Sequence, residues 1–324
     1  MWQIFLWVAL FIGGYIIIYF SADVFLDNLK DLCIVYGLSA FIMGSLIIGI
    51  DPEESVASIM ASANNLPYIA VGNVIGNSII ALTLCFAIPA LFYRFTFKKI
   101  SAFHFIMIYA SLFVIMLGFF ISFGLLIAGV AALSMYLIYL IRNIKYSRKE
   151  GVDKNGFDFK EEEEEDEKSK RKMIVFIIVS FAIIVGGGQL MIWAAKELII
   201  EIVTLTGISG TALESVFGFV IIAFVTNVEE LTLIIKSIQK HSVEIGIGGM
   251  IGKLVWNLTI TFGISAVILL NITFTWSLIW NSLILLAVLT IFYLIARKGK
   301  MGKIDGVILS SFFVLFLIVN FLII

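Results

Sequence analysis

The sequence has few of the residues that build most soluble active sites and metal clusters. Its 324 residues include only two cysteines, two histidines and three prolines, and only 14% of them are charged. Two cysteines in apolar surroundings supply neither a disulfide framework nor a thiolate cluster, and the scarcity of histidine excludes a soft-metal site. No nucleophile–base pair or cofactor loop appears, so an enzyme is the weakest interpretation and we expect no cofactor. Nothing indicates a nucleic-acid surface.

Apolar residues are abundant instead, and they form 61% of the chain. This composition is typical of a membrane protein, in which a spanning helix needs about 20 apolar residues. Eight runs are long enough, namely Ile4–Phe20, Ala40–Ile59, Pro67–Tyr93, Met173–Ala195, Ala212–Ile235, Ile245–Leu270, Phe274–Ala296 and Ile304–Ile324. The stretch Phe103–Ile141 is too long for one crossing and is divided near Gly118–Gly124, which makes ten spans. We expect an all-α, multi-pass protein that is monomeric in the lipid bilayer.

Basic residues gather in the odd-numbered loops of this arrangement, so the positive-inside rule makes that side cytoplasmic and places both termini outside. We expect the plasma membrane of a prokaryote. The hydrophilic segment Arg142–Lys172 separates a first half, residues 1–141, from a second half, residues 173–324. Its acidic run Glu161–Glu167 favours a solvated, disordered cytoplasmic linker because like charges repel, and a weak calcium-sensing role is the alternative.

The two halves repeat one polar pattern. When Gly13-Gly14 is aligned with Gly187-Gly188, two later pairs of motifs fall into register: Asp51-Pro-Glu53-Glu54 with Asn227-Val-Glu229-Glu230, and Gly72-Asn73-Val-Ile-Gly76-Asn77 with Gly248-Gly-Met-Ile-Gly252-Lys253. The spacing between the two motifs is the same in both halves. Because five spans is an odd number, the second half enters the membrane in the opposite orientation. The sequence therefore predicts an inverted repeat with an ion site at the midplane.

The expected chemistry follows from the cost of charge in the membrane, which is roughly 2.5–3.5 kcal/mol for a carboxylate near the centre of a span. The pseudo-twofold axis brings Glu54 and Glu230 together, and Asp51 lies one turn before Glu54 on the same helical face. Small-xxx-small glycine pairs allow the next helices to approach closely and to present amide oxygens. These amides are Asn73, Asn77 and Asn257. Such hard oxygens suit Ca²⁺, another divalent cation, or Na⁺.

These motifs resemble the signature repeats of the sodium/calcium exchangers of the calcium/cation antiporter superfamily, across essentially the whole chain. The family pattern is G-T-S-x-P-E on the second and seventh spans and G-N-x-I-G-S on the third and eighth. Glu54, Glu230, Thr226 and the run Gly72-Asn73-x-Ile-Gly76 match it. The resemblance implies ten helices in two inverted five-helix repeats. It also implies exchange of Ca²⁺ or another divalent cation for Na⁺ by alternating access.

The departures from the family pattern concern the residues that resemble sodium ligands. Asp51 and Asn227 stand where the family has the serines of its two signatures, and Asn77 and Lys253 stand where it has the later serines. The resemblance thus implies that Thr226, Asn227 and Asn257 also belong to the ion site, with a sodium stoichiometry that differs from the family's. Asn257 occupies a position where the family has an acid or an amide.

Lys253 is interpreted as a tethered cation that borders a sodium position and pairs with Glu54 or Glu230, the alternative being a structural ion pair. Glu53 and Glu229 point about 100° around the helix from their neighbours and are interpreted as auxiliary acids. Two other functions stay open. In a cation/proton exchanger of the same fold, titration of these groups would replace sodium, and in a cation sensor transport would be lost.

Overall fold

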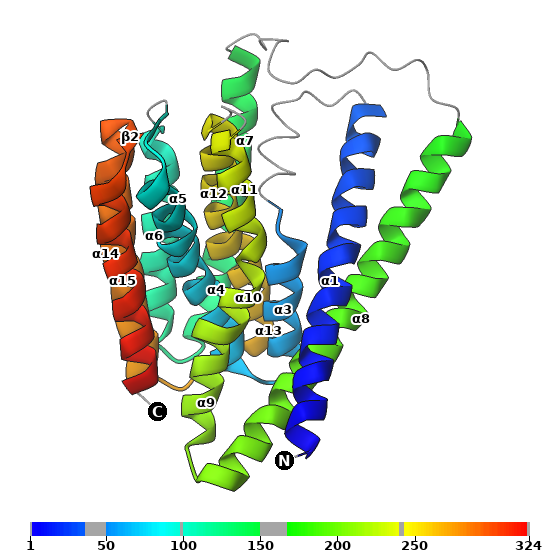
Figure 1. Cartoon of the computed structure of the whole chain (residues 1–324). Helices are drawn as coiled ribbons and strands as arrows, with labels where there is room; N and C mark the ends of the chain where they lie inside the picture. The colour runs from blue at the N-terminus through cyan, green and yellow to red at the C-terminus, as the bar shows by residue number, and fades with distance from the viewer. Residues whose placement is uncertain (1, 36–49, 98–99, 150–166, 240–242, 323–324) are drawn as a thin grey trace.

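The computed structural model describes residues 2–35, 50–97, 100–149, 167–239 and 243–322, and long helices form most of them (Figure 1). The helices of the first half are α1 (Trp2–Val35), α3 (Pro52–Ala63), α4 (Pro67–Leu82), α5 (Leu84–Phe92), α6 (Ala102–Gly118) and α7 (Gly124–Lys149). Those of the second half are α8 (Glu167–Thr206), α9 (Gly210–Val216), η1 (Phe217–Ile222), α10 (Ala223–Thr226), α11 (Val228–Gln239), α12 (Val243–Trp256), η2 (Asn257–Thr261), α13 (Phe262–Leu269), α14 (Trp276–Lys298) and α15 (Lys303–Leu322). Two short strands, β1 (Phe95–Thr96) and β2 (Lys300–Met301), pair antiparallel.

The chain runs back and forth between two ends of a helical bundle. Eight described segments are long and apolar enough to cross a membrane, α6 is a shorter apolar helix, and α3 overlaps the predicted second span. In Figure 1, α1 begins at the bottom and α8 begins at the top, and both termini lie at the bottom. The predicted fold is confirmed: ten spans form two five-helix repeats of opposite orientation.

The predicted topology differs from the observed helices in three places. The second span was expected to be one continuous helix, but Ile50 and Asp51 are not helical and α3 begins at Pro52, because Asp51 caps the helix and proline favours its first position. The third span divides at Thr83, between α4 and α5. Helices α7 and α8 extend into the segment 142–172 that was expected to be a loop. The first part of the predicted second span and residues 161–166 of the acidic run lie outside the described residues.

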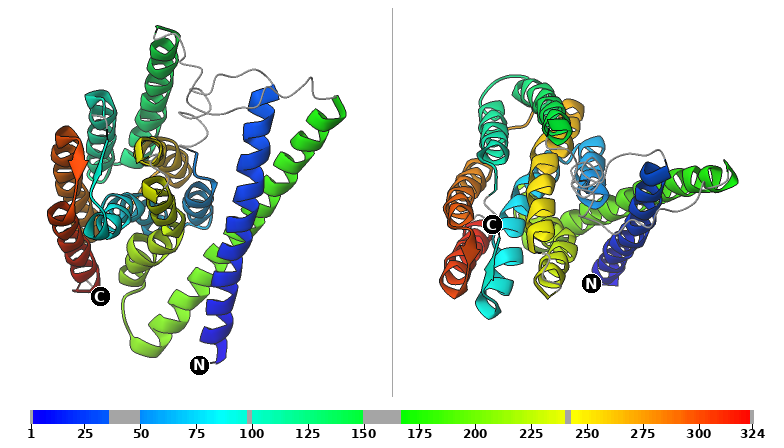
Figure 2. Two further views of the ribbon diagram at one scale, coloured as in Figure 1. Left: turned by 45° about the horizontal axis from the view of Figure 1, so that its top comes forward. Right: turned by 90° about the horizontal axis from the view of Figure 1, so that it is seen from above.

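Helices α1 and α8 form a long crossed pair at one side of the bundle (Figures 1 and 2). A Cβ atom added at Gly14 would lie 2.8 Å from the backbone nitrogen of Met191 and 2.9 Å from the carbonyl oxygen of Gly187. The crossing therefore requires glycine at Gly14, one of the positions that the repeat alignment had matched. Gly188 on α8 contacts Val56 of α3, so this pair also packs against the rest of the bundle.

Helix α4 lies at the centre of the bundle, and its residues from Tyr68 to Leu82 are all buried. A Cβ atom at Gly72 would lie 3.0 Å from the backbone nitrogen of Phe219 in η1, and one at Gly76 would collide with the carbonyl group of Phe219. The first small-xxx-small pair therefore allows close contact with the seventh span, as predicted. At Gly248, by contrast, no atom of the described residues lies within 4 Å of an added Cβ atom.

Candidate ion-binding site

Two helices begin about halfway along the bundle, and each carries two glutamates in its first turn (Figure 1). At the start of α3, Asp51 is the N-cap, and its Oδ1 atom accepts a hydrogen bond of 3.0 Å from the backbone N–H of Glu54. Glu53 and Glu54 thus lie where the partial positive charge of the helix N-terminus favours carboxylates. Discontinuous helices whose ends meet inside the membrane are typical of ion sites in transporters with inverted repeats.

The seventh span is interrupted at Asn227, between α10 and α11. The side-chain amide of Asn227 donates to the carbonyl oxygen of Ala223 at 2.7 Å and to that of Asn77 at 3.3 Å. Asn227 therefore stabilises the interruption and joins it to α4. Glu229 and Glu230 follow in the first turn of α11, which is the position that Glu53 and Glu54 hold in α3.

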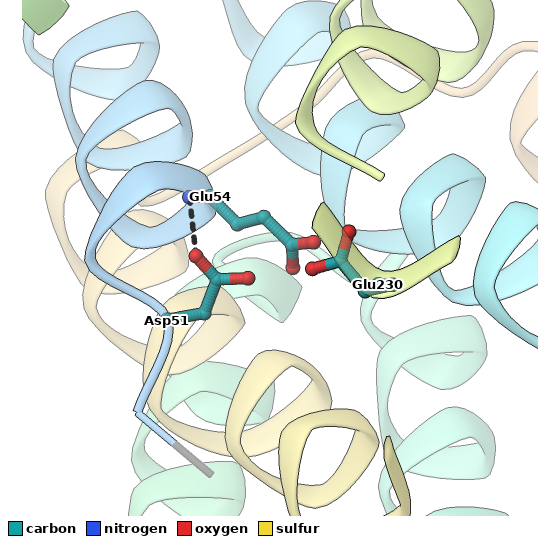
Figure 3. Close-up of side chains that lie close together, drawn as sticks. All are labelled: Asp51, Glu54 and Glu230. Carbon is teal, nitrogen blue, oxygen red and sulfur yellow. Dashed lines mark hydrogen bonds between the residues drawn. The ribbon is translucent and has the colours of Figure 1, made fainter. Parts of the chain in front are cut away.

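Asp51, Glu54 and Glu230 converge from these two helices, and one oxygen atom of each lies within 4.8 Å of the others. Figure 3 shows the carboxylates of Glu54 and Glu230 facing each other, with Asp51 beside Glu54. Their exposed fractions are 4%, 0% and 2%, respectively. Since a buried carboxylate is costly without a partner, this group requires a cation.

Among the described residues, the cation that meets these carboxylates is the side chain of Lys253, which enters from α12. Its ammonium contacts Asp51 and Glu230, and its Nζ atom is 3.6 Å from Oε1 of Glu54. The side chain is 15% exposed, which is too little for bulk water to solvate the charge. Lys253 therefore lies among the three carboxylates, where it joins Asp51 of the first half to Glu230 of the second.

Amides surround the carboxylates on the side of α4. Asn77 donates from Nδ2 to the carboxylate of Glu54 and, at 3.1 Å, to the hydroxyl of Thr226. Its Oδ1 atom accepts from Nδ2 of Asn257 at 3.4 Å. Asn73 donates to the hydroxyl of Ser58 at 2.9 Å. In this conformation Asn77 and Thr226 position Glu54, and their roles as ion ligands stay predictions.

Several buried oxygen atoms in this group have no hydrogen-bond partner among the described residues. They are Oε2 of Glu54, Oε2 of Glu230, Oδ1 of Asn73 and Oδ1 of Asn257. An unpaired buried acceptor costs free energy, about 1–3 kcal/mol for a neutral group, and a bound cation would recover it. The atoms are all carboxylate or amide oxygens, which are the ligands of hard cations such as Ca²⁺ and Na⁺. The donor set therefore fits a hard cation.

The two auxiliary acids lie beside this cluster. Glu53 is 3% exposed, Glu229 is half-buried, and Glu53 interacts electrostatically with Glu229, Asp51 and Lys253. On α1, the hydroxyl of Tyr15 is buried without a hydrogen-bond partner among the described residues and interacts with both acids. Glu53 and Glu229 therefore precede the two glutamates of the cluster in the first turns of α3 and α11.

Sequence reasoning missed a hydrogen-bonded group beside Lys253. Trp256 donates from Nε1 to the hydroxyl of Ser55 at 2.9 Å, and that hydroxyl is 2.8 Å from the hydroxyl of Thr261. These contacts hold the first turn of α3 against η2. The signal was a tryptophan one turn after Lys253, since a buried indole N–H usually has a hydrogen-bond partner.

Comparison with known proteins identifies the family. Residues 6–145 and 172–322 match the model of the sodium/calcium exchanger proteins. This chain belongs to that family. Among curated relatives, the inner membrane protein YrbG of Escherichia coli is 23% identical over an alignment of 324 positions that covers 95% of each chain. The uncharacterized membrane protein MJ0091 of Methanocaldococcus jannaschii is 24% identical over an alignment of 318 positions that covers 95% of this chain and 96% of that protein.

Solved structures of the sodium-calcium exchanger NCX_Mj share the fold of this family member. The form soaked with sodium and strontium superposes with a TM-score of 0.59 and 21% sequence identity, over 96% of this chain and 98% of that one. The form soaked with sodium and without calcium gives a TM-score of 0.57 at the same identity and coverage. The expected family and architecture are therefore confirmed at low sequence identity.

Proposed function

We propose that this family member exchanges Ca²⁺ or another divalent cation for Na⁺ across the membrane, by alternating access to the cluster of Asp51, Glu54 and Glu230. The family and the fold support a cation antiporter. We choose this site because three buried carboxylates converge there, with oxygens within 4.8 Å of one another. They converge where two helices begin, halfway along the bundle.

The charge of the cluster favours a divalent cargo. With all groups ionised, three carboxylates and one ammonium leave two negative charges, which one divalent cation neutralises. Ca²⁺ takes about six to eight oxygen ligands. The unpartnered oxygens of Glu54, Glu230, Asn73 and Asn257 are the first of these ligands in our proposal.

Lys253 gives the site a permanent positive charge, where the family pattern has a serine. In our proposal this ammonium takes the place of one co-transported sodium ion, because it satisfies the same carboxylates and cannot leave the protein. The chain then couples fewer sodium ions to each divalent cation than relatives with the serine do. A shallower dependence of divalent flux on sodium concentration is the expected signature.

The test is transport in proteoliposomes. We expect uptake of ⁴⁵Ca²⁺ when sodium is high inside, and loss of that uptake in Glu54→Gln and Glu230→Gln, because each variant removes one charge from the cluster. Glu197→Gln on α8, which lies outside the cluster, is the matched control and should retain uptake. Uptake that follows an imposed pH gradient and ignores sodium would instead establish cation/proton exchange. Calcium binding without any flux would establish a sensor.

A further inference from the structure

The hydroxyl of Ser55 joins both ends of helix η2 to the first turn of α3. It accepts a hydrogen bond of 2.9 Å from Nε1 of Trp256, the residue directly before η2. It also shares a hydrogen bond of 2.8 Å with the hydroxyl of Thr261, the last residue of η2. Ser55 is 8% exposed and Thr261 is fully buried. Both contacts therefore lie inside the bundle, between the first half of the chain and the second.

These two contacts depend on the shape of η2, which is a π-helix. Trp256 and Thr261 are five residues apart, so in an α-helix they would point about 140° away from each other around the axis. A π-helix closes its hydrogen bonds over five residues, and the backbone N–H of Phe262 bonds accordingly to the carbonyl oxygen of Asn257. The wider turn brings Trp256 and Thr261 toward one face, where both meet Ser55. Such turns are rare and are found frequently at functional sites.

The bond between Ser55 and Trp256 lies one turn from the contact between Lys253 and Asp51. Lys253 precedes Trp256 by three residues on α12, and Asp51 precedes Ser55 by four residues. The backbone N–H of Ser55 donates to the carbonyl oxygen of Asp51 at 3.1 Å. Residues at these spacings share a helical face. Helices α12 and α3 are thus joined at two successive levels, by an ion pair at the cluster and by a hydrogen bond one turn away.

We propose that Ser55 is a positioning residue of the ion site, which holds the ammonium of Lys253 among the carboxylates through its bond to Trp256. A lysine has a flexible four-carbon stem, so its own contacts do not fix the backbone from which it extends. The shorter link from Ser55 to Trp256 fixes the approach of α12 to α3. The indole ring is itself held edge-to-face by Tyr136 of α7, with the ring centroids 5.4 Å apart.

The position of the ammonium sets how strongly the cluster attracts a divalent cation. Lys253 contacts Asp51 and Glu230, two of the carboxylates that would hold the cargo, and like charges repel more strongly at short range in a buried setting. Loss of the bond between Ser55 and Trp256 should let the ammonium withdraw, so that calcium binds more tightly. This effect rests on the proposed function, whereas the position of the ammonium can be tested without any cargo.

Zero-length coupling with an apolar carbodiimide measures that position in chelator, in purified protein in detergent. Peptide mass spectrometry should find Lys253 joined to Asp51 or Glu230 in the parent, because the ammonium contacts both. Coupling of Lys298 to Asp305, an ion pair of 3.4 Å outside the site, is the internal reference. A general folding defect would lower both products, so the ratio of the Lys253 product to the reference reports positioning alone.

Two variants remove the same hydrogen bond from its opposite ends. Ser55→Ala and Trp256→Phe should each lower the ratio about threefold or more, whereas Ser55→Thr keeps the hydroxyl and should retain the parental ratio. Trp193→Phe is the matched control, because Trp193 packs edge-to-face against Trp7 on α1, away from the cluster, and should also retain it. A parental ratio in both Ser55→Ala and Trp256→Phe would overturn the proposal.

A double-mutant cycle with Lys253→Met tests the effect on binding, with CaCl₂ titrated into the same preparations. Ser55→Ala should raise calcium affinity about threefold to tenfold in the parent and change it less than about twofold in Lys253→Met, because the serine acts through the lysine. Weaker binding in both backgrounds would overturn the proposal, since Ser55 would then act on folding or on the cargo itself. If no protein of the cycle bound calcium while the coupling ratio fell as expected, the positioning role would stand and the proposed exchange of calcium would fail.

Discussion

Replacement of Lys253 by methionine should make the stability of the protein depend on added cation. The substitution keeps much of the apolar stem and removes the charge that contacts Asp51 and Glu230 and lies 3.6 Å from Glu54. Removing one member of a buried ion pair costs roughly 3–5 kcal/mol, because the partner is left buried and uncompensated. In the absence of cation, three carboxylates would face one another without a counter-charge.

Added calcium should restore much of this loss. A ligand that binds only the folded state stabilises it by about 2.7 kcal/mol when its concentration is about 100 times the dissociation constant. In the parent, the ammonium already neutralises part of the charge of the cluster, so calcium should stabilise the parent less than the variant. The variant should therefore be less stable than the parent in chelator and gain more from calcium.

Thermal unfolding in detergent, with chelator and with saturating calcium, measures both effects. Lys298→Met is the matched control, because Lys298 forms an ion pair of 3.4 Å with Asp305 at a position where the lysine is 56% exposed. Exposed pairs contribute about 0–1 kcal/mol, so the control should change little in either buffer. A Lys253→Met protein as stable as the parent in chelator, with the same calcium response, would refute the reasoning and make Lys253 peripheral.

Three other predictions test separate parts of the structure. Asp51→Asn should keep the N-cap of α3 and lose only the charge, whereas Asp51→Ala should be less stable than Asp51→Asn by about 1 kcal/mol in thermal unfolding. Gly76→Val should destabilise by about 1–3 kcal/mol or more, because its Cβ atom collides with the backbone of Phe219, while Gly13→Ala, with nothing within 4 Å, should not. A cysteine introduced at position 164 should resist an impermeant reagent in intact cells, and a cysteine at position 2 should react. The reverse labelling would invert the predicted orientation.

The sequence was sufficient to predict the repeat and the convergence of Asp51, Glu54 and Glu230. Equal spacing between the motif ending in Glu54 and Asn77, and between that ending in Glu230 and Lys253, identified the repeat because inverted copies place equivalent residues around one axis. The cost of charge in a membrane then required those acids to meet a cation. The structure places Lys253 with Glu230 and near Glu54, which is the pairing the sequence had suggested.

Local geometry could not be predicted in the same way. The apolar run that precedes Asp51 and Pro52 has the composition of a continuous span. The sequence Asp-Pro-Glu-Glu, however, is also a strong signal for the start of a helix. Asn77 turns its amide nitrogen, and not its amide oxygen, toward Glu54. This orientation depends on hydrogen bonds to Thr226 and Asn257 of the other repeat. Spacing in one chain carries no information about such contacts between halves.

The two charges that break the symmetry of the repeat compensate each other. Asp51 is matched by the neutral Asn227 in the other half, and Lys253 is matched by the neutral Asn77. One departure adds a negative charge and the other adds a positive charge, so the pair leaves the net charge of the cluster unchanged. Because the two side chains are in contact, the added charges also satisfy each other locally and join the two repeats. Either change alone would alter the net charge of the buried cluster, so Asp51 and Lys253 are electrostatically coupled.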